Sequence, residues 1–127
     1  MVSISLMYSG ALGLTGVIAG AIGSHALKAK TAEERNAFVT GSQYQLMHSM
    51  AALAALALSH AVRNTSPVAA KRLHISAYMF LVGTTLFSGT VYARVFGAPQ
   101  SMGQLAPAGG YIMMGGWASL IAAAMAL

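Results

Sequence analysis

The residues of this chain that could carry chemistry are few. It has four histidines, five tyrosines and two acidic residues, and it has no cysteine. The absence of cysteine excludes disulfides and thiolate metal sites. The two carboxylates, Glu33 and Glu34, are adjacent, and no nucleophile stands at a recognisable spacing from a base and a third orienting group. The sequence therefore predicts a protein that is not an enzyme and that holds no metal or cofactor.

Two stretches place polar side chains at helical spacing. Tyr44 and His48 are four residues apart, as are Ser88 and Tyr92, while Gln45 and His48 are three apart. Residues at these spacings share a face of an α-helix. An unpaired polar group in lipid costs several kcal/mol. If these stretches cross a membrane, we expect the polar faces to point inward and toward one another.

The composition requires an apolar solvent around the helices that carry these residues. Of 127 residues, 57% are hydrophobic and 7% are charged, whereas a soluble domain has about 25% charged residues. Residues 1–27, 36–62, 73–93 and 95–127 contain no Asp, Glu, Lys or Arg. A helix needs about 20 apolar residues to cross a bilayer core, and each stretch supplies that number. The sequence predicts four transmembrane helices.

The net charge of +5 does not indicate nucleic-acid binding, because the basic residues form no single patch. They stand in short groups at the ends of the apolar spans, where such residues anchor helices and contact lipid head groups. With four spans, Lys28, Lys30, Arg35 and Arg94 lie on one side, and Arg63, Lys71, Arg72 and the α-amino group lie on the other. The counts are equal, so the positive-inside rule leaves the orientation open.

Cap signals set the expected helix boundaries. Thr31 and Glu34 fit a capping box, and Ser66-Pro67 fits an N-cap followed by proline at the first helical position. Residues 97–106 read as a loop, and Pro107 then opens the last helix. The predicted fold is all-α, a single transmembrane domain of four helices over residues 3–24, 32–62, 67–96 and 108–127, with both termini on the same side.

Helix direction places a set of polar residues in one half of the bilayer. Small residues at GxxxG-like spacing, such as Gly16 and Gly20, let helix backbones approach closely in lipid, and Trp117 is expected to fill a contact between helices. The candidate polar cluster comprises His25, Tyr44, Gln45, His48, Ser88 and Tyr92. The candidate positions for helix packing or ligand approach are Gly16, Gly20, Gly23, Gly89, Pro107, Gly109, Gly110, Gly116 and Trp117.

Two histidines on facing helices could also ligate haem iron. However, His25 is expected near the interface, with His48 about 9 to 15 Å deeper at 1.5 Å per residue. His60 and His74 are expected at the opposite surface, where interfacial histidines are ordinary. The depths therefore argue against a haem site.

Four motifs in order carry a family resemblance. They are Gly20-Ala-Ile-Gly-Ser-His-Ala-Leu-Lys28, Tyr44-Gln-Leu-Met-His48, Leu86-Phe-Ser-Gly-Thr-Val-Tyr92, and Pro107-Ala-Gly-Gly110 with Gly116-Trp117 after it. In these motifs the chain resembles the transmembrane protein 256 family, also called domain of unknown function 423, which includes YgdD-like bacterial proteins. The resemblance implies a four-helix protein of a bacterial inner membrane or a mitochondrial membrane, and it implies no reaction. Ser24 and Ala106 depart from the usual pattern, in which a small apolar residue and Thr are common.

Two classes of function remain from the sequence. The first is a non-catalytic accessory subunit of a larger membrane complex, for example a respiratory one, or a homo-oligomeric scaffold, with lipids and other membrane subunits as partners. The second is a small transporter or channel, or a lipid- or quinone-binding protein, that uses the polar cluster around His48. No charged residue lies in the middle of a predicted span and no broken helix is indicated, which disfavours the second class.

Overall fold

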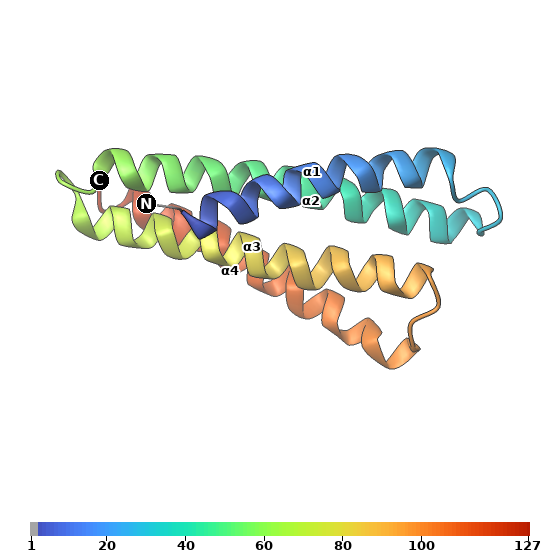
Figure 1. Cartoon of the computed structure of the whole chain (residues 1–127). Coiled ribbons are helices and arrows are strands. Elements are labelled where there is room, and N and C mark those ends of the chain that lie inside the picture. The colour runs from blue at the N-terminus through green and yellow to red at the C-terminus, as the bar shows by residue number, and fades with distance from the viewer. Residues whose placement is uncertain (1–2) are drawn as a thin grey trace.

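The computed structural model describes residues 3–127, and its architecture is all-α (Figure 1). Four α-helices follow one another: α1 (Ile4–His25), α2 (Ala32–Val62), α3 (Pro67–Val95) and α4 (Leu105–Ala124). A short 3₁₀ helix, η1 (Gln100–Gln104), precedes α4. The two ends of the chain lie at the same end of the bundle as the α2–α3 connection (Figure 1). These features confirm the predicted fold class and the placing of both termini on one side.

The helix starts follow from local chemistry. In α2, the Thr31 hydroxyl accepts from the Glu34 backbone N–H at 3.1 Å, and the Glu34 carboxylate accepts from the Thr31 N–H at 2.9 Å. This reciprocal pair is the predicted capping box. In α3, Pro67 occupies the first turn, but the Ser66 side chain makes no capping hydrogen bond. The fixed φ of Pro67 therefore favours this helix start without help from a serine cap.

The last helix begins earlier than the sequence indicates. It starts at Leu105 instead of residue 108 and ends at Ala124, and η1 shortens the loop expected over residues 97–106. Pro107 is the third residue of α4. The first four N–H groups of a helix have no partner within the helix, so proline is tolerated there without any lost hydrogen bond.

Helix α3 lies at the centre of the packing. It packs along α2 on one side and along α4 on the other, whereas α1 packs mainly on α2 and touches α3 only briefly. One buried cluster joins α2 and α3 through Ala52, Ala55, Ala77, Phe80 and Leu81. A second cluster, formed by Ala19, Leu27, Phe38 and Val95, holds α1 at the end of the bundle with the α1–α2 connection. Helix α3 therefore packs closely on both α2 and α4, whereas the bundle is more open between α1 and α3.

Three of the helices, α1, α2 and α3, are long and apolar enough to cross a membrane. Helix α2 has 31 residues, about 46 Å at 1.5 Å per residue, so part of it must extend beyond the hydrocarbon layer. Helix α4 has 20 residues and no charged residue. Its glycines and aromatic residues lower its mean hydropathy. We still predict from the sequence that α4 crosses the membrane beside the other three helices.

Candidate functional site

Gln45, in the middle of α2, joins three helices. Its amide nitrogen donates to the backbone carbonyl of Leu12 at 2.8 Å and to the hydroxyl of Thr15 at 2.7 Å, both on α1. Its amide oxygen accepts from the Tyr92 hydroxyl of α3 at 2.7 Å. The Gln45 side chain is buried. This amide is therefore a buried bridge between α1, α2 and α3.

A groove of about 340 Å³ lies beside the Gln45 bridge, between α1 and α3. None of the described residues that line it is charged. Polar groups in its wall are already bonded within the chain: the Thr85 hydroxyl donates to the Leu81 carbonyl, and the Ser88 hydroxyl donates to the Gly41 carbonyl, both at 2.7 Å. The groove therefore presents mainly an apolar surface.

His48 joins α2 to α4. Its Nδ1 lies 2.8 Å from the Tyr44 carbonyl oxygen, and its Nε2 lies 3.2 Å from the indole nitrogen of Trp117. A carbonyl can only accept a hydrogen bond and an indole N–H can only donate one. The partners thus place the imidazole proton on Nδ1 and the accepting lone pair on Nε2. Because the Trp117 indole occupies the Nε2 lone pair, His48 has no nitrogen free for a metal or haem iron.

Aromatic rings pack around the buried His48 side chain. The His48 ring stacks on Tyr44 at 5.7 Å between centroids and meets the edges of Phe80 at 5.6 Å and Trp117 at 5.9 Å. Phe80 and Trp117 also contact each other at 4.8 Å. The His48–Trp117 pair is therefore the polar centre of an aromatic cluster that joins α2, α3 and α4, with Phe80 and His48 buried and with Tyr44 and Trp117 about 40% exposed.

The structure divides the predicted polar cluster into separate sites. Gln45 meets Tyr92, while His48 meets Tyr44, and Ser88 bonds to the backbone of α2 instead of to Tyr92. Residues three apart on a helix point about 60° away from each other. On α2 this angle sends Gln45 toward α1 and α3 and His48 toward α4.

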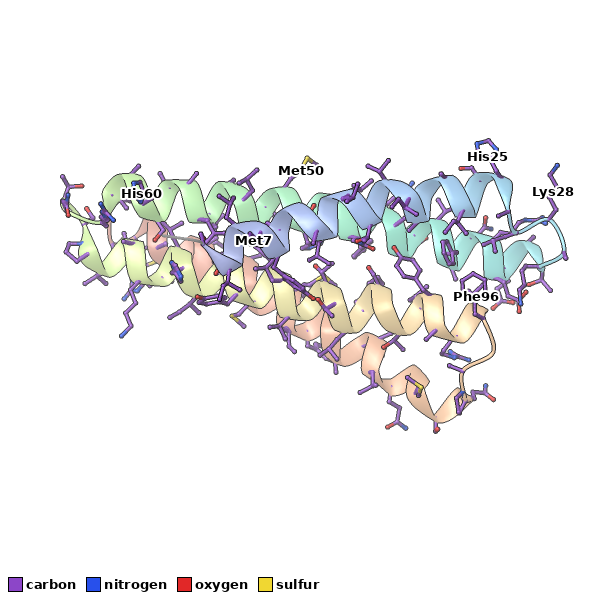
Figure 2. The ribbon with its side chains drawn as sticks, in the orientation of Figure 1. Met7, His25, Lys28, Met50, His60 and Phe96 are labelled. Atoms are coloured by element: carbon purple, nitrogen blue, oxygen red, sulfur yellow. The ribbon has the colours of Figure 1, made fainter. Side chains whose placement is uncertain are left out.

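His25 does not belong to either site. It is the last residue of α1 and is exposed, and its side chain points away from the helices at the end of the bundle (Figure 2). The expectation that it joins the cluster was based on depth along the helix, and depth does not determine which way a side chain faces.

Glycines bring α3 and α4 into backbone contact. A Cβ atom built on Gly109 would lie 2.6 Å from the Gly83 carbonyl oxygen, and one built on Gly83 would lie 2.7 Å from the Gly109 oxygen. Further along, a Cβ on Gly116 would lie 2.8 Å from the Phe80 ring, and the Ser76 hydroxyl donates to the Gly116 carbonyl at 2.7 Å. Only glycine permits these approaches, in line with the packing role expected for Gly109 and Gly116.

The other candidate glycines differ from one another. A Cβ on Gly16 would lie 3.0 Å from the Leu46 side chain, and one on Gly23 would lie 3.2 Å from Phe38, so both positions lie in a close α1–α2 contact. At Gly20 the nearest atom would be 3.9 Å away, and at Gly89 and Gly110 nothing lies within 4 Å. Gly89 and Gly110 therefore do not serve helix packing within the chain.

Several residues that hold the helices together were not singled out from the sequence. Gly41 and Gly83 were visible as glycines within apolar spans. Nothing in the sequence indicated that Thr15 and Ser76 bond to other helices, because a hydroxyl in a helix can donate its hydrogen bond to a backbone carbonyl of the same helix. Arg72 was assigned to the membrane surface, yet it also donates to the Ala122 carbonyl of α4 at 2.6 Å.

Comparison with known proteins agrees with this architecture. The family model described as "Protein of unknown function (DUF423)" matches residues 19–110. The chain is 38% identical over 97 residues to a UPF0382 membrane protein of Haemophilus influenzae, across 76% of this chain and 70% of the relative. It is 30% identical over 123 residues to the UPF0382 inner membrane protein YgdD of Escherichia coli, across 96% of this chain and 89% of the relative.

A eukaryotic relative is also found. The chain is 29% identical over 116 residues to a UPF0382 membrane protein of Schizosaccharomyces pombe, across 86% of this chain and 91% of the relative. No solved structure matches the chain.

The matches cover most of the chain, and the relatives are named membrane or inner membrane proteins. Together with three helices of membrane-spanning length and hydropathy, they identify a multi-pass integral membrane protein. The family resemblance expected from the four motifs is confirmed. The chain belongs to the DUF423 family, the YgdD-like UPF0382 membrane proteins.

Proposed function

We propose that this DUF423 protein acts through helix packing and not through catalysis, as an accessory subunit of a larger membrane complex or as a scaffold built from several copies. One observation carries the proposal. Among residues 3–127, every buried side-chain nitrogen or oxygen has a hydrogen-bond partner. Polar atoms bonded between helices stabilise the helix positions and are not available to a substrate.

The acidic residues support the non-catalytic part of the proposal. Glu34 is engaged in the capping box of α2, and Glu33 is exposed in the first turn of the same helix. Over the described range, no three His, Cys, Asp or Glu side chains gather in a way that could hold a metal ion. Neither nitrogen of the buried His48 is free to act as a base.

Open glycines on the apolar outer surface support an assembly role, whereas the apolar side chains around them suit lipid equally well. Large apolar side chains are exposed on α4, where Tyr111 is 70% exposed and Ile121 is 65% exposed, and on α1, where Val17 is 63% exposed. Gly10 and Gly110 lie on open parts of these two helices, where nothing lies within 4 Å of an added Cβ. Small residues on a lipid-facing surface let a neighbouring helix approach closely.

The test is the composition of the native particle. A tagged copy is extracted from its own membrane in a mild detergent, and the mass and protein content of the particle are measured. Other subunits at a fixed stoichiometry would support the accessory role, and several copies of this chain alone would support the scaffold. A particle that contains one copy and no other protein would contradict both.

Two variants locate the docking face in the same experiment. We expect Gly10→Leu and Gly110→Leu to leave the fold intact, because a Cβ atom at either position meets no atom of the chain within 4 Å. Loss of partners in one variant, with unchanged helix content, would place the contact on that helix. Retention of partners in both would place it elsewhere on the surface.

A second candidate is a small transporter or a protein that binds a lipid or quinone. The observation that favours it is the groove between α1 and α3, which reaches the Gln45–Tyr92 bond. In liposomes, flux that disappears in Gln45→Leu, while the helices remain folded, would support this candidate over the packing role.

A further inference from the structure

A larger pocket lies at the other end of α2, away from the Gln45 groove. It has a volume of about 860 Å³ and is formed by the start of α1, the last turns of α2 and the first turns of α3. The α2 residues that line it, from Leu53 to Arg63, follow one face of the helix, as residues spaced by three and four do. At 1.5 Å per residue this face is about 15 Å long, the length of a substantial part of an acyl chain.

The deeper walls of the pocket are apolar. Leu6 from α1, Leu53 and Leu56 from α2, and Ile75 from α3 supply them. Those from α2 and α3 lie one to three turns inside the basic ends of their helices, which carry Arg63 and Lys71. In a membrane this part of the pocket faces the hydrocarbon layer, so it suits a lipid tail and not a soluble anion.

The rim of the pocket is basic. Arg63 and His60 from α2 and Lys71 and His74 from α3 line it, and all four side chains are exposed. Figure 2 shows His60 at this end of the bundle, opposite the end that carries Lys28. The only acidic side chains of the chain are Glu33 and Glu34, at the start of α2. No carboxylate side chain therefore neutralises the rim among the described residues that line the pocket.

Several basic residues near either end of the bundle already interact with the protein itself. Arg72 is used by the fold, since it donates to the Ala122 carbonyl of α4, and it does not line the pocket. At the opposite end of the bundle, Arg35 donates to the Lys30 carbonyl at 3.1 Å and Lys30 lies over the Phe96 ring. Arg63 and Lys71, by contrast, both line the mouth of this apolar pocket.

We infer that this pocket binds one anionic phospholipid of the surrounding membrane, with the phosphate between Arg63 and Lys71 and an acyl chain along Leu53, Leu56 and Ile75. Basic side chains at the membrane surface attract anionic head groups. The histidines add further hydrogen-bonding groups, although His74 already has the Tyr78 hydroxyl at 3.2 Å from its Nε2. This inference does not depend on the packing role proposed above.

The test is lipid binding to the purified full chain by native mass spectrometry. Phosphatidylglycerol, phosphatidylcholine and inorganic phosphate are added separately to the protein in a non-ionic detergent. We expect one phosphatidylglycerol to bind in preference to phosphatidylcholine, and phosphate alone not to bind. Equal binding of the two lipids, or binding of phosphate alone, would overturn the inference.

Matched variants separate the pocket from general attraction to a basic surface. The double variant Arg63→Gln/Lys71→Gln should weaken phosphatidylglycerol binding about 25-fold, since each cation near an anionic lipid contributes about fivefold. The control Lys28→Gln/Arg94→Gln removes the same charge at the opposite end and should change binding less than about threefold. Equal losses in the two double variants would contradict a built site.

A third variant tests the apolar part of the pocket. Ala57 lines the pocket and is exposed, so Ala57→Trp should fill the space without disturbing the core and leave both cations in place. We expect it to weaken phosphatidylglycerol binding as much as the charge variant does. Unchanged binding in Ala57→Trp would show that the lipid does not enter the pocket and would refute the inference.

Discussion

The α3–α4 interface and the attachment of α1 show two ways of holding membrane helices together. Between α3 and α4, Gly83 and Gly109 let two backbones touch, and hydrogen bonds from Ser76 and Arg72 to carbonyls of α4 add to this contact. Helix α1 has no such backbone contact among the described glycines and depends on side-chain contacts: hydrogen bonds from Gln45, a bond between the Tyr8 and Thr85 hydroxyls, and close packing around Gly16 and Gly23. It leaves a groove of about 340 Å³ beside α3.

The difference follows from what drives helix association in lipid. Lipid tails are as apolar as leucine, so apolar side chains gain little by leaving them, and packing contacts and interhelical hydrogen bonds decide the outcome. Backbone contact at glycines is intolerant of any added atom. Hydrogen bonds across a looser contact can be lost one at a time. We therefore expect the α3–α4 contact to be the more sensitive to substitution.

The largest effect should come from Gly109→Leu at the α3–α4 contact. Its Cβ alone would lie 2.6 Å from the Gly83 carbonyl oxygen, so the helices must separate. Overpacking of this kind costs about 3 kcal/mol, measured as a lower free energy of unfolding in a detergent titration. The control is the adjacent Gly110→Leu, whose Cβ meets nothing within 4 Å and which should change stability by less than about 0.5 kcal/mol. Equal losses in the two variants would refute the steric account.

A smaller effect is expected from Gln45→Leu at the attachment of α1. The change removes three hydrogen bonds to Leu12, Thr15 and Tyr92. At about 0.6 kcal/mol for each interhelical bond, the free energy of unfolding should fall by about 1 to 2 kcal/mol. The matched control is Gln43→Leu, because Gln43 is exposed on the same helix and should tolerate the change.

Cross-linking sharpens the comparison. If the Gln45 bridge positions α1, a cysteine pair placed across α1 and α3 should cross-link less efficiently in Gln45→Leu, whereas a pair across α3 and α4 should be unaffected. A loss of both cross-links would mean that Gln45 supports the whole bundle and not α1 in particular.

The smallest effect should come from the His48–Trp117 bond between α2 and α4. A double-mutant cycle of His48→Leu and Trp117→Phe isolates this bond, and we expect a coupling of about 0.6 kcal/mol. Backbone packing of α4 on α3 should hold α4 in place when the bond is lost. A coupling of more than about 2 kcal/mol would show instead that a polar bond, and not glycine packing, holds α4.

Particular residues show how much of the candidate site the sequence could predict. The spacing of Gln45 and His48 indicated correctly that polar side chains are buried in the middle of α2. The spacing could not predict that Gln45 and His48 have different partners. The two side chains point about 60° apart around the helix axis and therefore meet different helices. Gly109 and Gly110 are neighbours in sequence, yet one touches a backbone and the other is open. No local pattern distinguishes them.

The sequence by itself determined that this is a helical membrane protein. Long charge-free stretches suit lipid, and in lipid the backbone must bond to itself, which makes the spans helical. The capping box and Pro67 then mark the starts of α2 and α3. The tertiary structure decided which face of each helix meets which neighbour: that α3 is central, that α1 leaves a groove, that His25 points away, and that Arg63 and Lys71 face one pocket. The physical reason is that hydrophobicity varies little around these helices, so the rotation of each is determined by its contacts with its neighbours.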